Sequence, residues 1–287
     1  MDWKGFMMMS MENNVPLETI QKIEFDILKY IRDVCDANGL RYYLAYGTLI
    51  GAVRHQGFIP WDDDMDIHMP RPDYMKFVEI VKRDPHPYYR LVSLETSDKY
   101  AYLWAKVIDK RTRLVQDSPW IQKEDLGFFV DIFVLDGAGK TLKEAEATYE
   151  KAFDIFKQYR RSVKKMFNKR ESRSLTFARW IYHIPQRLLG NRYWMERHEK
   201  FCLQKAYDDC EYVGALGAGT KKPSRNVWKK DCFGGGTNVV FCGELFRAPE
   251  NWDEVLRSEY GDYMMLPPVE QRQSNHNFLL CEVQEDV

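Results

Sequence analysis

The chain has 287 residues, of which 45% are hydrophobic, a content that supports a substantial core and excludes a disordered chain. Its 42 basic and 43 acidic residues give a net charge of −1, so no overall positive field favours binding to nucleic acid. The six cysteines form no C-x-x-C pair, which is typical of free thiols in a reduced compartment. No apolar run has the length of a signal peptide or a transmembrane helix, so the sequence predicts a soluble, cytoplasmic protein.

The first part of the chain alternates helical and extended patterns. Apolar residues at spacings of three and four predict an amphipathic helix over residues 17–38, which an Asn-Gly pair ends. An aromatic-rich strand over residues 40–46 comes next and runs into a short helix that ends near residue 54. A strand over residues 62–69 follows, and prolines separate it from another short helix over residues 74–82.

The rest of the chain contains three further predicted strands, over residues 89–94, 101–109 and 128–135. The pattern is helical from 141 to 212, rich in glycine from 214 to 236, and extended again from 238 to 246. Helices and strands mix without strict βαβ repetition, which indicates an α+β fold with a mixed sheet. The sequence therefore predicts a catalytic core over residues 1–140, a helical insertion over 141–212, and a C-terminal part over 213–287 that completes the core.

The strand over residues 62–69 carries four carboxylates in its first five positions. A period of two separates its side chains onto opposite faces, with Asp62, Asp64, Asp66 and His68 on one and Met65, Ile67 and Met69 on the other. Carboxylates two positions apart on a strand lie about 7 Å apart and repel each other unless a cation lies between them. Oxygen ligands without thiolates favour Mg²⁺ or Mn²⁺, and substrate phosphates commonly complete the shell of magnesium. The pattern therefore predicts a metal site and a phosphate-bearing substrate, with a solvated acidic loop as the alternative.

A single aspartate, Asp131, interrupts the apolar strand over residues 128–135. Burying an unpaired carboxylate costs several kcal/mol, so a cation or a shell of hydrogen bonds must compensate it. We expect Asp131 to be the third carboxylate of the metal site, and a structural pair with an arginine is the alternative. Asp136, which stands directly before a glycine, is predicted to be a turn residue.

A phosphate-binding turn is predicted where the strand over residues 40–46 meets the next helix. Gly47 allows the backbone to approach a phosphate, and the amides and the Thr48 hydroxyl at the helix start are suitable donors to its oxygens. Arg54, one or two turns further on, is expected to add a charge-assisted contact, with an exposed ion pair as the alternative. The turn precedes Asp64 by 17 residues along the chain.

At these residues the chain resembles the LicD family, the bacterial relatives of fukutin and fukutin-related protein in the nucleotidyltransferase-fold superfamily. The matching stretches are YGTLIGAVRHQGFIPWDDDMDI (46–67), AKVIDKRT (105–112), VDIFVLDG (130–137) and APENWDEVLRSEYGDYMMLPP (248–268). The superfamily pattern is a glycine, a small hydroxyl residue and then Asp-x-Asp, and it maps onto Gly47-Thr48 and Asp64-Met65-Asp66, with Asp131 as the third acid. The resemblance implies a nucleotidyltransferase-fold mixed sheet core.

The resemblance also implies an activity, which is transfer of a phospho-alcohol group, most often phosphocholine from CDP-choline, with release of CMP. The acceptor is a hydroxyl on a cell-surface glycan precursor such as a teichoic acid or lipopolysaccharide. Ribitol phosphate from CDP-ribitol, or NMP transferred to a small molecule, are the alternatives. Asp64 and Asp66 would hold Mg²⁺ or Mn²⁺, and Asp131 would be its third ligand or the base that takes the acceptor proton. Asp62 is a further candidate for that base.

Two more residues enter through the resemblance. Lys106 lies in the matched AKVIDK segment, where its ammonium is expected to meet a phosphate, with a surface lysine as the alternative. His276 stands where many relatives carry a pair of histidines, but Asn275 precedes it here, so the motif departs from the family pattern.

Residues 157–197 contain twelve Lys or Arg and two acids, with aromatic residues interleaved. Such a segment is typical of a solvated helical face. It also fits a peripheral surface for an anionic, lipid-linked glycan acceptor or for the inner face of the cell membrane.

Overall fold

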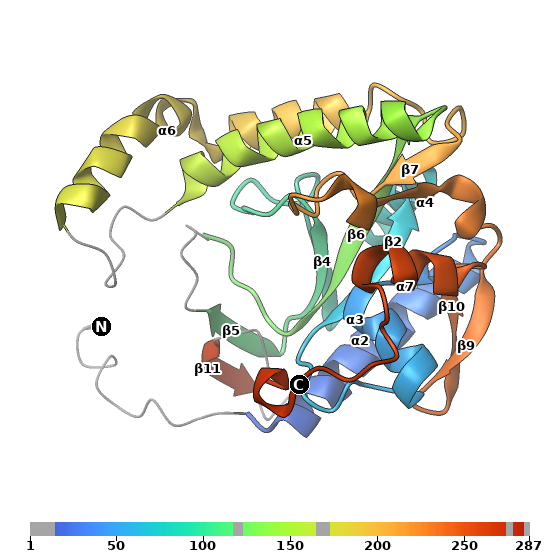
Figure 1. The fold of residues 1–287 in the computed structure, drawn as a ribbon. Coiled ribbons are helices and arrows are strands. Elements are labelled where there is room, and N and C mark those ends of the chain that lie inside the picture. The colour runs from blue at the N-terminus through green and yellow to red at the C-terminus, as the bar shows by residue number, and fades with distance from the viewer. Residues whose placement is uncertain (1–14, 117–122, 165–172, 274–277, 284–287) are drawn as a thin grey trace.

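The computed structural model describes residues 15–116, 123–164, 173–273 and 278–283, and its centre is a curled mixed sheet (Figure 1). Five strands follow one another in the order β1-β2-β6-β4-β3, with the bounds Tyr43–Leu44, Met65–Pro70, Phe129–Gly139, Ala105–Asp109 and Tyr89–Val92. β2 and β6 are parallel, and the other neighbours in this order are antiparallel. The predicted mixture of helices with a mixed sheet is therefore confirmed.

Further strands extend this arrangement. The far end of β6 pairs with β7 (Tyr212–Gly214), which in turn pairs with β8 (Val227–Lys229). Two separate two-stranded antiparallel sheets pair β9 (Thr237–Phe241) with β10 (Glu244–Ala248) and β5 (Thr112–Gln116) with β11 (Phe278–Val283). The division of the chain into a core, an insertion and a C-terminal part stays a prediction.

The α-helices of the described chain are α2 (Leu17–Ala37), α3 (Tyr46–Ile50), α4 (Arg71–Arg83), α5 (Leu142–Val163), α6 (Arg173–Cys202) and α7 (Trp252–Tyr260). A π-helical turn over Gly51–His55 continues α3, and short 3-10 turns cover Pro223–Arg225, Lys230–Cys232 and Val269–Gln271. The part of α6 after Gly190, whose φ is 77°, runs beside α5, whereas the part before Gly190 turns away from it (Figure 1). None of the described helices has the length and apolar character needed to cross a bilayer.

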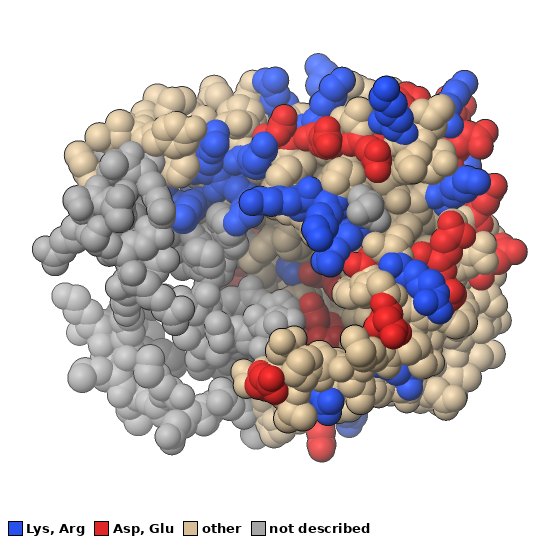
Figure 2. Space-filling view, in the orientation of Figure 1, with Lys and Arg blue, Asp and Glu red and all other residues tan. Residues whose placement is uncertain are grey.

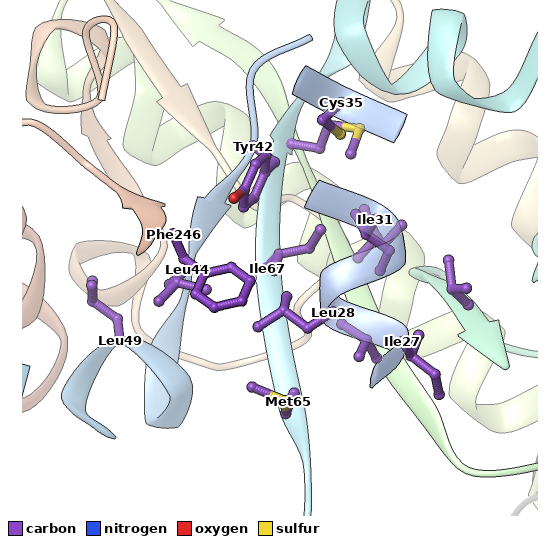
Figure 3. Packing of buried hydrophobic residues seen from close by; sticks show 14 of the residues in the cluster. Ile27, Leu28, Ile31, Cys35, Tyr42, Leu44, Leu49, Met65, Ile67 and Phe246 are labelled. Carbon is purple, nitrogen blue, oxygen red and sulfur yellow. The ribbon is translucent and has the colours of Figure 1, made fainter. Parts of the chain in front are cut away.

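The main hydrophobic core lies between α2 and the strands β1 and β2 (Figure 3). Met65, Ile67 and Met69 are each 0% exposed and belong to this core, which confirms the predicted apolar face of the strand. Leu28 of α2 lies toward β2 in Figure 3, and Ile27, Leu28 and Ile31 are equally buried in the same core. The alternation of apolar and polar residues along β2 thus fixes which face meets α2 and leaves the other face for the charged side chains.

Several predicted elements have different bounds in the structure. The strand expected over residues 40–46 is only two residues long, because Tyr46 already opens α3 with a φ of 46°. The strand expected over 238–246 is the hairpin of β9 and β10, since Cys242 and Gly243 both have positive φ and form its turn. β8 lies within the region that was expected to be only a glycine-rich loop.

Asp136 is a strand residue and not the turn residue that its following glycine suggested. Its carboxylate accepts two hydrogen bonds from the Arg71 guanidinium, at 2.7 and 3.1 Å. The same guanidinium donates to Glu199 of α6, at 2.6 and 3.2 Å. Arg71 therefore joins the start of α4, the end of β6 and the second half of α6.

We predict that Arg71→Ala lowers the free energy of unfolding by about 3–5 kcal/mol, because it leaves the buried carboxylate of Asp136 without its cation. Urea unfolding of the purified variant measures this. Arg257→Ala is the control, since Arg257 makes an exposed ion pair with Asp253 on α7 and its removal is expected to change little. Equal losses in the two variants would contradict the prediction.

Candidate active site

Three charged side chains lie in a row across β2, β6 and β4. The strand register pairs Asp66 with Asp131 and Asp131 with Lys106, so the three project from the same face of the sheet. The Lys106 Nζ lies 2.5 Å from Asp131 Oδ1, and the indole of Trp104 donates to Asp131 Oδ2 at 2.9 Å. Within the described ranges, a lysine and an indole therefore compensate the buried Asp131, where an arginine was the alternative. Lys106 is only 3% exposed and is not a surface lysine.

A second group of acids lies at the start of β2. Among the residues that the structure describes, Asp62, Asp63 and Asp64 bring ligand oxygens within 4.8 Å of one another, the spacing of a cation site. Sequence reasoning missed Asp63, because a period of two assigns it to the apolar face. It is indeed only 3% exposed, whereas Asp62 and Asp64 are partly exposed.

The predicted phosphate turn lies directly against these acids. A Cβ added to Gly47 would lie 2.6 Å from Asp62 Oδ2, so only a glycine lets the carboxylate approach α3 this closely. The Thr48 hydroxyl accepts a hydrogen bond from the backbone N–H of Asp66 at 2.8 Å, and Thr48 is 4% exposed. These two residues therefore fix the position of the acidic strand, whatever else they bind.

Burial and like charges raise the pKa of the Asp66 carboxyl well above its usual range. Burial is the largest cause, followed by the charges of Asp64, Asp131 and Asp62, and the ammonium of Lys106 opposes them. This excess of negative charge is the observation that fits a bound divalent cation.

Glu24 of α2 is a further acid that the sequence reasoning missed. Its side chain is 0% exposed and its carboxylate oxygens have no hydrogen-bond partner within the described ranges. Gln21, one turn earlier, donates to the Asp62 carbonyl at 2.9 Å and so holds this part of α2 beside the acidic segment. Burial and then the charges of the nearby aspartates raise the pKa of Glu24 well above its usual range. The signal was available, because Glu24 falls on the apolar face of the predicted helix.

His68 lies among aromatic rings and does not join the acids. Its ring is 4.9 Å from that of Tyr46 and 5.2 Å from that of Trp228, measured between centroids. Neither ring nitrogen has a hydrogen-bond partner in the described part of the chain, and burial lowers the pKa of His68 to about 3. The imidazole is therefore neutral at physiological pH and packs as an aromatic residue.

Of the two remaining predicted site residues, Arg54 and His276, the structure describes Arg54. Arg54 donates to the carbonyl of Tyr263 at 2.5 Å and thus joins the turn after α3 to the segment after α7. Burial lowers the pKa of its guanidinium. His276 lies outside the described residues.

The face of the molecule shown in Figure 2 is hollowed at its middle. Acidic side chains lie inside the hollow, and a group of Lys and Arg side chains lies above it, at the level of α5 and the loop in front of it in Figure 1. An anionic substrate that enters this hollow meets cations at its rim before it reaches the carboxylates.

The sequence around the site matches a known protein family. The family model described as LicD/FKTN/FKRP, nucleotidyltransferase domain, matches residues 39–187. The chain belongs to the LicD family. This match includes the phosphate turn, all five aspartates of the site and Lys106.

Individual relatives agree with this LicD assignment. The chain is 29% identical over 263 residues to the lipopolysaccharide cholinephosphotransferase LicD of Haemophilus influenzae, a match that covers 89% of this chain and 94% of the relative. It is also 49% identical over 39 residues to the human ribitol 5-phosphate transferase FKRP, which covers 14% of this chain and 8% of FKRP. An uncharacterized protein of Rickettsia typhi is 37% identical over 67 residues, or 23% of this chain and 22% of that protein.

We predict that Thr48→Val lowers stability by about 1–3 kcal/mol, because the N–H of Asp66 loses its acceptor. Thr48→Ser keeps the hydroxyl and is the matched control, with a smaller loss that reflects only the missing methyl group. Thermal unfolding of the two variants measures the difference. Equal melting temperatures for the valine and serine variants would contradict the role of this hydrogen bond.

A second prediction concerns pH. The folded protein keeps a proton on Glu24 at pH values where the unfolded chain, with a pKa near 4.5, has lost it. Stability therefore falls as the pH rises above 4.5, and Glu24→Gln removes this loss. In EDTA, the variant should gain stability relative to the parent protein as the pH rises from 4.5 to 8. Glu18→Gln, an exposed change on the same helix, should leave the pH dependence unaltered, and parallel curves for both variants would contradict the prediction.

Proposed function

We propose that this chain is a metal-dependent phosphotransferase that moves phosphocholine from CDP-choline to a hydroxyl of a cell-surface glycan precursor, and that it releases CMP. The observation that carries the proposal is the similarity to the Haemophilus cholinephosphotransferase, which extends over nearly the full length of both chains. The acceptor class is a lipopolysaccharide precursor, as the name of that relative suggests, or a teichoic acid precursor. The mixed sheet is, in this proposal, a nucleotidyltransferase-fold core, which the description of the matching family model supports.

Asp64, Asp66 and Asp131 are the proposed ligands of one Mg²⁺ or Mn²⁺ ion. The raised pKa of Asp66 supports this set, because the surplus negative charge needs a cation for the carboxylates to be ionised together. Asp62 and Asp63 lie close enough to Asp64 to contribute an oxygen. When bound, such an ion would neutralise charge on the diphosphate and on the departing CMP.

The protein groups around Asp131 have distinct tasks in this proposal. Trp104 and Lys106 hold both carboxylate oxygens and so fix the direction in which Asp131 faces the acceptor hydroxyl. The ammonium of Lys106 lies two strands away from Asp66, on the far side of Asp131, where it favours an approaching phosphate. Asp62, beside Gly47, takes the proton of the acceptor hydroxyl as it attacks phosphorus, and Asp131 is the alternative base where it does not bind the ion.

A second candidate is transfer of ribitol phosphate from CDP-ribitol. The segment of 39 residues shared with FKRP at 49% identity favours it, since FKRP is named as a ribitol 5-phosphate transferase. Transfer of NMP from a nucleoside triphosphate, with release of pyrophosphate, is the third chemistry that an assay must distinguish.

The first half of α6 is the proposed contact with a lipid-linked acceptor at the inner face of the membrane. Five large side chains there are more than half or about half exposed, namely Phe177, Ile181, Tyr182, Leu188 and Leu189. The basic segment 157–197 surrounds them along the sequence. Exposed apolar residues beside cations suit the interface of an anionic bilayer.

The test is an assay of the purified protein with Mg²⁺, a lipopolysaccharide or teichoic acid acceptor, and CDP-choline, CDP-ribitol or CTP in parallel. We expect CMP release and phosphocholine transfer with CDP-choline. Asp66→Asn and Asp64→Asn should each reduce the rate at least about 100-fold, because each weakens charge stabilisation that the transition state needs. Asp209→Asn, an exposed change away from β2, is the control and should keep full activity.

Pyrophosphate release from CTP would replace the proposal with nucleotidyl transfer, and CMP release from CDP-ribitol alone would select the second candidate. Full activity of Asp66→Asn would contradict the catalytic role of the acidic row in all three.

A further inference from the structure

The loop between β7 and β8 carries positive charge that nothing above assigns to a function. Residues 212–230 contain five Lys or Arg and no acid. Lys221, Lys222 and Arg225 fall within five positions of the loop, and all three are exposed. None of the three forms a salt bridge with any described residue. Exposed cations that form no salt bridge are available for an anionic ligand.

Hydrogen bonds fix both ends of this basic segment. Asn226 follows Arg225 and is 1% exposed, and Thr220 precedes Lys221. The Asn226 Nδ2 donates a hydrogen bond to the Thr220 hydroxyl at 2.7 Å. The hydroxyl of Tyr149 on α5 reaches the carbonyl of Thr220 at 3.2 Å. The cations therefore lie on a short loop whose two ends are joined by a hydrogen bond and which is also hydrogen-bonded to α5.

The same loop is joined directly to the acidic site. The hydroxyl of Tyr46 donates to Asn226 Oδ1 at 2.7 Å, and Tyr46 is the residue before Gly47. This hydrogen bond between the loop and the predicted phosphate turn holds the loop with its cations at a fixed position relative to the carboxylates. Figure 2 agrees with this arrangement, since Lys and Arg side chains lie over the hollow that contains the acidic ones.

α7 supplies a second, independent connection. It packs against both α3 and the turn Pro223–Arg225. Glu259 of α7 is 3% exposed, and its carboxylate has no hydrogen-bond partner in the described chain. Burial raises the pKa of Glu259, and the charge of Arg225 opposes that rise. Burial, then the charge of Glu259 and then those of Asp66, Asp62 and Asp64 raise the pKa of the neighbouring Tyr260, so this end of α7 lies near the acidic row as well as near the turn that contains Arg225.

A diphosphate needs such cations at this site. Its negative charges are repelled by the carboxylates of β2 and β6, and one divalent ion neutralises only part of that charge. Guanidinium and ammonium groups on the opposite wall supply the rest through charge-assisted hydrogen bonds.

We propose that Lys221, Lys222 and Arg225 form a binding site for the diphosphate of a nucleoside diphosphate donor, and that the bonds from Tyr46 through Asn226 to Thr220 hold this site across from the carboxylates. The identification of the ligand as the donor rests on the proposed function, whereas the anion site itself does not. Arg225 is the central residue, because it alone of the three is placed beside α7 and next to the anchored Asn226.

Binding measurements in EDTA test the site without turnover or metal. Calorimetric titration with CDP, inorganic pyrophosphate and cytidine should show that Arg225→Ala weakens CDP and pyrophosphate binding about 10-fold or more and leaves cytidine binding unchanged. Lys221→Ala with Lys222→Ala should act in the same direction. Lys229→Ala, an exposed lysine on the adjoining β8, is the matched control and should bind all ligands as the parent does.

Tyr46→Phe tests the positioning bond separately. It keeps the ring that packs against His68 and removes only the donor to Asn226. We expect Tyr46→Phe to bind CDP more weakly although all three cations are still present. Arg225→Lys should recover part of the affinity that is lost in Arg225→Ala. Affinity that falls with added salt in the parent and hardly changes in the triple alanine variant is a further expected result.

The outcomes separate this inference from the proposed function. Unchanged CDP and pyrophosphate binding in the Arg225 and double-lysine variants overturns the anion site, even if the parent protein transfers phosphocholine. Weakened binding in those variants upholds the site, even if CDP-choline is not a substrate. If Lys229→Ala lost as much affinity for CDP and pyrophosphate as these variants, the effect would be one of general surface charge, and the site would also be overturned.

Discussion

The repulsion among carboxylates at one end of the sheet is the constraint on which the arrangement of this protein depends. Asp66 lies beside Asp131 on parallel strands, and the aspartates before β2 add their charges. Their mutual repulsion would push these carboxylates apart, but the ammonium of Lys106 on the adjacent strand and the indole of Trp104 hold Asp131 in place. The Thr48 hydroxyl does the same for the backbone of Asp66. The sheet thus keeps negative charge concentrated in the region where we propose that a cation and a phosphate bind.

The C-terminal third completes the site from the side that faces the acids. Arg54 is fastened to the carbonyl of Tyr263, and Tyr46 to the amide of Asn226, so both ends of the phosphate turn bond to residues beyond the matched family segment. The acids lie on the sheet and the cations on the β7–β8 loop. In the proposed site a diphosphate would lie between these two groups, and Figure 2 shows acidic side chains in the hollow with Lys and Arg side chains above it.

Buried charge also organises the region away from the acids. Arg71 bonds to Asp136 and Glu199 and so joins α4, β6 and α6, which places the long helices over the end of the sheet. Glu24 remains without a hydrogen-bond partner among the described residues and lies near the same aspartates that surround the site. The aspartates of the candidate site thus also affect the stability of the fold through Glu24. The proposed cation would reduce the electrostatic repulsion among these carboxylates.

Local pattern in the sequence determined the alternation along β2, the helix over residues 17–37 and the candidate acids, because a period of two or of 3.6 is a property of neighbouring residues. Long-range pairing decided the rest. Whether Asp131 meets Lys106 depends on the register between β6 and β4, and whether Asp63 and Glu24 lie beside the other acids depends on how α2 packs on the sheet. The bond from Tyr46 to Asn226 spans 180 positions, and no periodicity in the chain encodes a contact at that separation.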